Sequence, residues 1–157
     1  MSSRTVYEGR LITVVVEDGM EIVHHADAVA IVAVDDENRV VLVRQERPAV
    51  ASRLLELPAG LLEAGESQLE CAQRELQEET GLRGGDWTRL TGVYMTPGFC
   101  DERMHLFLAT GVEEGEPAPD EGEELEVVRV PVSELGELLP EIDDAKTLAG
   151  LLLFLRL

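Results

Sequence analysis

Three glutamates within five residues carry the clearest chemical signal in this sequence. Glu75, Glu78 and Glu79 stand at positions i, i+3 and i+4. At about 100° per residue these positions share one side of a helix. Like charges so spaced destabilise a helix unless water or cations screen them, and carboxylate oxygens are the ligands that hard divalent cations prefer. The spacing therefore favours a cation site, although a solvated acidic helix face has the same pattern.

A helix must hold these glutamates, and the sequence marks both of its ends. Ser67, with Glu70 three residues later, forms a capping box, and Gly81 is the residue type that ends many helices. The helix is therefore predicted over residues 68–80. Its apolar face is predicted from three residues at helical spacing, which are Leu69, Ala72 and Leu76.

The whole segment 60–82 resembles the Nudix box, the signature of a family of diphosphate hydrolases. The box requires glycine, five residues, glutamate, seven residues, and then Arg-Glu-apolar-any-Glu-Glu-any-Gly-apolar, and this sequence meets every fixed position. The resemblance implies an α/β fold, an α/β/α sandwich with a mixed sheet. It also implies that the box forms a loop, a helix and a loop that hold Mg²⁺, or Mn²⁺, against a diphosphate.

The resemblance further implies a role for each matching residue of the box. The metal ligands that it assigns are the side chains of Glu75, Glu79 and Glu78 and the main-chain carbonyl of Ala59. Gly60 is expected to let the chain turn. Glu66 and Arg74 are expected to shape the loop and to orient the ligating glutamates, which places Arg74 and Glu78 among the catalytic residues.

A second acidic segment, DEGEELEV at residues 120–127, resembles the loop that supplies the last catalytic carboxylates in one branch of this family. By position, Glu121 matches the general base and Glu123 a further metal ligand. An ordinary acidic loop has the same composition. Both roles are therefore expectations from resemblance.

That branch is the ADP-ribose pyrophosphatase branch, which the chain resembles along nearly its whole length. The resemblance is carried by VYEGRLITVVVEDG, by LVRQERPAV with LLELPAG, by TPGFCDERMHLFLA and by DDAKTLAGLLLFL. A forked guanidinium suits a phosphate, although surface arginines are as good an interpretation. The residues expected to bind substrate are Arg44, Arg47, Arg53, Glu56, Gly60, Pro97, Phe99 and Glu102.

The implied reaction is metal-dependent hydrolysis of a nucleoside diphosphate linked to another group. The expected substrate is ADP-ribose, which would yield AMP and ribose 5-phosphate. A nucleotide sugar or a dinucleotide is an alternative that keeps the metals and changes the loops. A noncatalytic Nudix ligand-binding module and a plain acidic cation buffer are the alternatives from other classes.

The elements that position this chemistry follow from hydropathy patterns. A β-rich stretch over 6–16 and a short strand over 20–23, joined by the turn Asp18-Gly19, predict paired N-terminal strands. The resemblance implies that residues 1–24 exchange between the subunits of a homodimer and that residues 25–157 form the catalytic domain. Further strands are predicted at 28–34, 40–43, 87–94, 104–109 and 125–130, and helices at 133–139 and 143–157.

Composition excludes several partners. A formal net charge of −19 argues against nucleic acid, because a phosphate backbone needs a basic surface. No apolar run approaches membrane-spanning length, and the opening MSSRTVYEGR lacks the apolar core of a secretory signal. A cytoplasmic enzyme with two reduced cysteines, Cys71 and Cys100, and a small-molecule partner is therefore expected.

Overall fold

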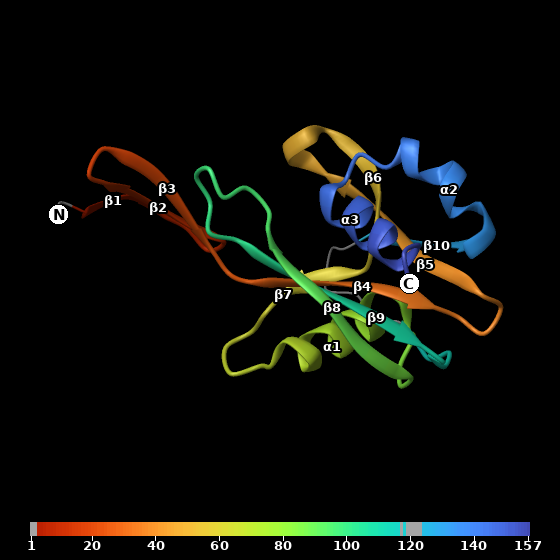
Figure 1. Cartoon of the computed structure of the whole chain (residues 1–157). Coiled ribbons are helices and arrows are strands. Elements are labelled where there is room, and N and C mark those ends of the chain that lie inside the picture. The colour runs from red at the N-terminus through yellow and green to blue at the C-terminus, as the bar shows by residue number, and fades with distance from the viewer. Residues whose placement is uncertain (1–2, 117, 119–123) are drawn as a thin grey trace.

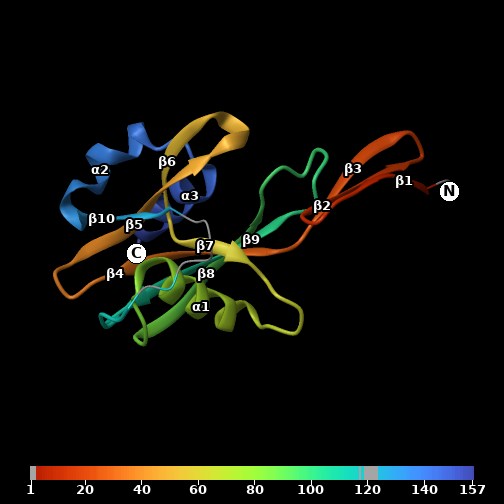
Figure 2. The same cartoon turned by 180° about the vertical axis from the view of Figure 1, so that it is seen from behind.

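A seven-stranded mixed sheet lies between helices in the computed structural model, and a separate three-stranded sheet extends from one end (Figures 1 and 2). The structure describes residues 3–116, 118 and 124–157. The separate sheet contains β1 (Ser3–Glu8), β2 (Ile12–Glu17) and β3 (Met20–His25). The main sheet contains β4 (Ala28–Val34), β5 (Arg39–Arg47), β6 (Ser52–Glu56), β7 (Ala59–Leu61), β8 (Asp86–Tyr94), β9 (Arg103–Thr110) and β10 (Glu126–Pro131). The helices are α1 (Gln68–Thr80), α2 (Leu135–Leu138) and α3 (Ala145–Phe154), with single 3-10 turns at Pro48–Val50, Val132–Glu134 and Leu139–Glu141.

Strand β4 is the centre of the main sheet, and all seven of its residues are buried. The strand order is β10-β5-β4-β9-β8, with β6 beside β5 and β7 beside β4. Strand β9 runs parallel to β4, whereas β5 and β7 run antiparallel to it. The α/β prediction with a mixed sheet is therefore confirmed.

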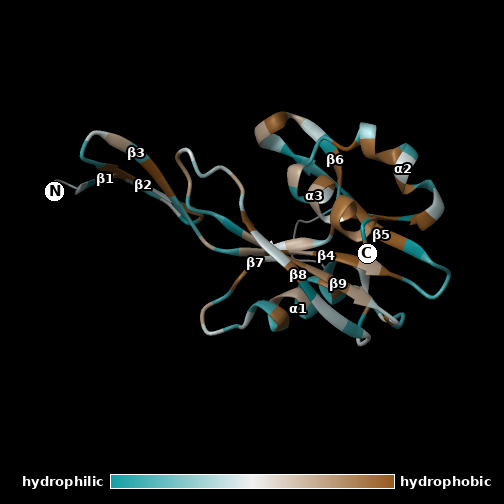
Figure 3. Ribbon diagram, viewed as in Figure 1, coloured by the Kyte–Doolittle hydropathy of each residue, from teal (hydrophilic) through white to brown (hydrophobic). Residues whose placement is uncertain are grey.

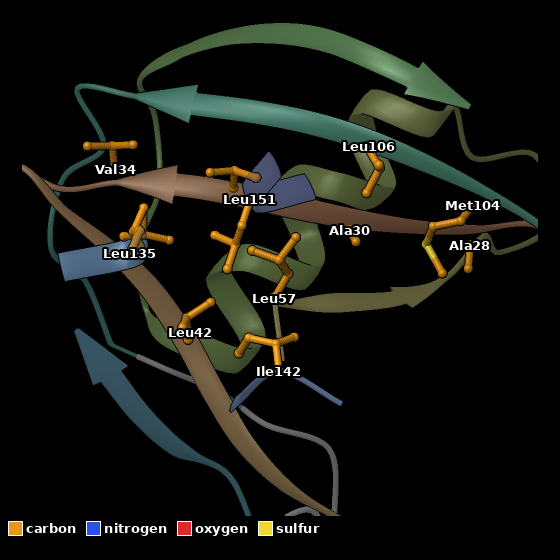
Figure 4. Close-up of a cluster of buried hydrophobic side chains, with 12 residues drawn as sticks. Ala28, Ala30, Val34, Leu42, Leu57, Met104, Leu106, Leu135, Ile142 and Leu151 are labelled. Atoms are coloured by element: carbon orange, nitrogen blue, oxygen red, sulfur yellow. The ribbon is translucent and has the colours of Figure 1, made fainter. Parts of the chain in front are cut away.

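Side chains of β4 alternate between two cores, as a strand covered on both faces requires. Val29 and Ile31 pack with Leu76 of α1 on one face. On the other face Ala30 belongs to a cluster with Leu57 and Leu151, against which α2 and α3 pack (Figure 4). The hydrophobic residues gather where β4, β5 and α3 meet (Figure 3). Helix α1 and the start of α3 therefore lie on opposite faces of the main sheet.

Helix α1 begins and ends where the sequence predicts. The Ser67 side chain accepts from the main-chain N–H of Glu70, the reciprocal bond completes the capping box, and Gly81 ends the helix at φ 78°. The predicted apolar face is wrong at one position, because Leu69 is 40% exposed. Leu69 lies in the first turn, at the edge of the arc that Cys71, Ala72 and Leu76 bury against the sheet.

The N-terminal strands form the paired sheet that was predicted, with one more turn than expected. Asp18 and Gly19 adopt φ of 48° and 90°, as a tight hairpin turn requires. The predicted stretch 6–16 is divided into β1 and β2 by a turn in which the Gly9 N–H donates to the Ile12 carbonyl at 2.9 Å. That additional turn lies at the end of the separate sheet nearest the main sheet, so β1 runs toward the main sheet and β2 runs away from it.

Four other elements differ from prediction. Strands β6 and β7 were not predicted, because each is short and Pro58 separates them. The helix predicted at 133–139 is a four-residue helix flanked by 3-10 turns, and the last helix covers ten residues rather than 143–157. Asp144 begins α3 as its N-cap, accepting from the Thr147 N–H at 2.9 Å. No helix in the described part of the chain is long and apolar enough to cross a membrane.

Candidate active site

A cavity of about 720 Å³ opens where β7 and α1 meet β5, β6 and the start of α3. Its lining is strongly acidic and contains nine of the residues predicted from sequence. These are Arg47, Glu56, Ala59, Gly60, Arg74, Glu75, Glu78, Glu79 and Glu102. The fold therefore brings the metal-ligand candidates and part of the substrate-binding candidates to one place.

Arg74 ties the acidic loop to the helix. Its Nε donates to Oε1 of Glu66 at 2.8 Å, and its Nη1 donates to Glu75 at 2.7 Å and to Glu78 at 3.0 Å. Its Nη2 donates to the Leu61 carbonyl at 3.1 Å. Hydrogen bonds from Arg74 lower the pKa of Glu66 to about 2, so this carboxylate stays ionised at neutral pH. Arg74 thus orients two of the proposed ligands, as a supporting residue does.

Gly60 has a steric role that differs from the expected one. It lies in β7 and is not among the residues with positive φ, so the expectation that it lets the chain turn is wrong. A Cβ added at Gly60 would lie 1.9 Å from the carboxyl carbon of Glu75. The missing side chain therefore makes room for the Glu75 carboxylate against the strand.

Glu79 lies on the same side of α1 and is only 6% exposed. The main-chain N–H of Ala59 donates to its Oε2 at 3.2 Å. One proposed carboxylate ligand therefore lies directly beside the residue whose carbonyl is the proposed main-chain ligand. This contact and the space left by Gly60 place Glu75 and Glu79 along the start of β7.

These residues fit a hard divalent cation, because every donor they offer is oxygen. Within residues 3–116, 118 and 124–157 no three His, Cys, Asp or Glu side chains already surround a common point. Arg74 instead supplies the positive charge between Glu75 and Glu78. The oxygen donors, the cradle at Gly60 and the balancing arginine suit Mg²⁺ or Mn²⁺ without distinguishing between them.

On the opposite side of the cavity lies an ion network centred on Glu56, which is 1% exposed. Arg47 donates to both of its oxygens at 2.8 Å, and Lys146 of α3 donates to Oε2. Burial alone would raise the pKa of Glu56, but these two cations lower it overall. The sequence prediction included Arg47 and Glu56 but missed Lys146 and its second partner Asp144, which lie 90 and 88 positions beyond Glu56 in the chain.

Two further cavity residues were missed because they come from the turn between β1 and β2. Arg10 and Leu11 line the cavity. Among the described residues no carboxylate pairs with Arg10, whereas Arg47, Arg74 and Lys146 are all paired. Arg10 is therefore a cation available to an anionic ligand.

Four predicted substrate residues do not line this cavity in the described chain. Arg44 and Arg53 lie on neighbouring strands and both approach Glu126, at 3.6 and 3.9 Å. Pro97 and Phe99 line a separate cavity of about 590 Å³ beside β3. Their roles in binding stay predictions.

The predicted general base Glu121 and the further ligand Glu123 lie outside the described residues. The chain just before them is anchored at the site, because the N–H of Ala118 donates to the Glu78 carbonyl at 2.9 Å. Cys71 packs beneath the loop, where its thiol donates to the Leu61 carbonyl at 3.3 Å. Burial raises the pKa of this thiol to about 12, so it is no nucleophile.

Comparisons with known proteins agree with this geometry. The NUDIX domain family matches residues 24–151. The chain is 38% identical to an ADP-ribose pyrophosphatase of Bacillus subtilis (strain 168), over 94% of this chain and 86% of that protein. It is 42% identical to an ADP-ribose pyrophosphatase of Mycobacterium tuberculosis, over 84% of this chain and 66% of that protein. A crystal structure of an ADP compounds hydrolase superposes with a TM-score of 0.85 at 30% identity, over 99% of this chain and 91% of that one.

Proposed function

We propose, since this chain belongs to the Nudix family and is a Nudix pyrophosphohydrolase, that it hydrolyses ADP-ribose to AMP and ribose 5-phosphate. The observation that carries the proposal is the arrangement of Glu75 and Glu79 along β7, with Arg74 between the loop and the helix. The substrate is supported by the two similar proteins whose names specify ADP-ribose.

In this proposal Glu75, Glu79, Glu78 and the carbonyl of Ala59 hold Mg²⁺, with Mn²⁺ as the other suitable ion. When bound, such ions neutralise phosphate charge and lower the pKa of water. Arg74 keeps Glu75 and Glu78 oriented toward the cavity. Without cations the acidic lining would repel a diphosphate. The same carboxylates therefore bind the metal and make substrate binding depend on it.

Glu121 is proposed as the general base that accepts the proton of the attacking water. Glu123 is proposed as a further metal ligand. The support is the hydrogen bond from the Ala118 N–H to the main-chain carbonyl of Glu78. This bond places Ala118, which precedes both residues in the sequence, beside one of the proposed metal ligands. A carboxylate that reaches a water beside the metals would accept its proton as general base.

The anionic parts of the substrate are assigned to the cations of the cavity. Arg47 presents a guanidinium to the cavity, and Arg10 faces it from the β1–β2 turn. Glu102, whose Oε1 lies 3.8 Å from Nδ1 of His25, is proposed as a contact to a ribose hydroxyl. The two arginines suit this role because a guanidinium offers a phosphate a fork of donors rather than a point charge.

The test is product release by the purified protein with Mg²⁺ or Mn²⁺, across ADP-ribose, nucleotide sugars, dinucleotides and nucleoside triphosphates. We expect ADP-ribose to be preferred, AMP to be formed, and a chelator to abolish turnover. Preference for another diphosphate would reject the substrate and retain the metal chemistry. Silence across the whole panel would favour the noncatalytic ligand-binding alternative.

We also propose a homodimer formed through the N-terminal sheet. The support is the exposed apolar surface of this sheet, where Val6, Tyr7 and Met20 are 47%, 56% and 65% exposed. Gel filtration of the full chain against a variant lacking residues 1–22 measures this directly. A full chain that elutes as a monomer would reject the proposal.

A cytoplasmic location is part of the same proposal. The two cysteines are both free thiols, one buried and one half-buried. Unpaired cysteines are typical of a reducing compartment.

A further inference from the structure

The Glu56 network joins parts of the chain that lie far apart in the sequence. Arg47 ends β5, Glu56 ends β6, and Lys146 is the second residue of α3. Lys146 is 7% exposed and contacts two carboxylates, Oε2 of Glu56 and, at 3.0 Å, Oδ1 of Asp144. All four of these side chains line the cavity of the proposed active site.

The geometry of the Arg47–Glu56 pair directs one edge of the guanidinium into the cavity. Nε and Nη2 of Arg47 hold the two oxygens of Glu56 in a bidentate pair, and Nη1 has no hydrogen-bond partner among the described residues. The Arg47 side chain is 40% exposed, whereas that of Glu56 is 1% exposed. A buried carboxylate therefore fixes a guanidinium whose remaining donors face the substrate space.

Lys146 makes the Glu56 network electrically neutral. Arg47 and Lys146 balance Glu56 and Asp144, so the four groups are neutral together. Without the lysine, Arg47 would face two carboxylates alone, and the group would carry one negative charge in a cavity that is already acidic. A phosphate would be repelled, and removing one member of a buried ion network leaves its partner charge uncompensated.

The start of α3 is held rigidly against β6 by a second tie. The Leu57 N–H donates to Oγ1 of Thr147 at 2.8 Å, and the Asp144 carboxylate caps the helix by accepting from the Thr147 N–H. Helix α3 also packs closely here, since a Cβ on Gly150 would lie 2.5 Å from Leu57. The Lys146 ammonium is thus fixed relative to Glu56 by the backbone on both sides.

We propose that Lys146 is a positioning residue that holds Glu56 from α3 so that Arg47 presents its free guanidinium edge to a phosphate of the substrate. This role rests on the proposed function, because it needs a phosphorylated ligand in the cavity. The competing interpretation is that the network only attaches α3 to the sheet. That interpretation predicts lower stability without a specific loss of substrate affinity.

The test is steady-state kinetics on ADP-ribose with Mg²⁺ for Lys146→Met, Lys146→Arg, Arg47→Gln and the double variant Arg47→Gln with Lys146→Met. We expect Lys146→Met to raise KM about tenfold with kcat changed less than about threefold, the scale of a lost supporting contact. Lys146→Arg should restore most of the affinity. In the Arg47→Gln background, Lys146→Met should change KM less than about twofold, because both act through one contact.

The matched control is Leu148→Ala, which weakens the packing of α3 against the core and leaves all four charges and their hydrogen bonds in place. It should lower Tm and leave KM unchanged. A Lys146→Met enzyme with wild-type KM, or with the same KM increase in both backgrounds, would overturn the positioning role.

Calorimetric binding of a non-hydrolysable ADP-ribose analogue, in which a methylene group replaces the bridging oxygen of the diphosphate, repeats the comparison with Mg²⁺ present and without turnover. Lys146→Met should weaken Kd about tenfold there as well, and an equal Kd would overturn the role. Wild-type protein that binds the analogue but does not hydrolyse ADP-ribose would contradict the proposed function alone. Wild-type protein that neither binds the analogue nor hydrolyses ADP-ribose would contradict both.

Discussion

Replacing Glu79 by glutamine is expected to reduce kcat by roughly 10²–10³-fold or more while the protein folds normally, the scale for losing one electrostatic contact to the transition state. Glutamine has the same shape and keeps an oxygen that can accept from the Ala59 N–H. It lacks the charge that a divalent cation requires. The measurement is kcat on ADP-ribose at saturating Mg²⁺, with circular dichroism and Tm to verify the fold.

The control for this variant is Glu137→Gln, which makes the same charge change at an exposed position of α2 outside the cavity lining. It should retain wild-type turnover. A Glu79→Gln enzyme that retained full turnover would remove the main support for catalysis. The noncatalytic ligand-binding alternative would then become the better interpretation of the box.

The sequence was most informative where the signal is local. The capping box at Ser67 and the C-cap at Gly81 defined α1, and the box spacing selected Glu75 and Glu79, which the structure places together at β7. These features depend on residues a few positions apart. Side-chain direction on a helix follows from such spacing alone.

Long-range pairing could not be predicted in the same way. Lys146 lies 90 positions beyond Glu56, and only the packing of α3 across β4 brings them into contact. The cavity position of Arg10 depends equally on the unpredicted turn between β1 and β2. Each residue alone looks like an ordinary surface cation, so no local pattern distinguishes it.

The arginines of β5 show how one missed boundary affects a site prediction. The strand was predicted over 40–43, but it extends to Arg47. Arg44 and Arg47 are three positions apart on one strand, so their side chains leave opposite faces of the sheet. Arg47 consequently reaches Glu56 and the cavity, whereas Arg44 approaches Glu126. The chemistry of an arginine fork suited both residues, and only the strand geometry distinguishes them.

Gly60 provides the second large expected effect, and its physical basis is steric. A Cβ at this position would lie 1.9 Å from Cδ and Oε1 of Glu75, far inside any allowed contact. The atoms it meets are the end of a flexible side chain, so the backbone can remain in place while the carboxylate moves. Gly60→Ala should therefore change the free energy of unfolding by no more than about 1 kcal/mol. It should nevertheless reduce kcat/KM by about 10²-fold, because small displacements of catalytic groups are this costly.

Two comparisons separate this displacement from a general effect of replacing glycine. Gly136→Ala, in α2, adds a methyl group with nothing within 4 Å and should leave turnover unchanged. Adding Gly60→Ala to a Glu75→Gln enzyme should cost little more than Glu75→Gln alone, since both changes remove the same carboxylate from the site. If the two losses instead multiplied, or if Gly60→Ala kept full activity, the carboxylate of Glu75 would not need the space beside β7. The proposed ligand set would then lose the residue on which its geometry most depends.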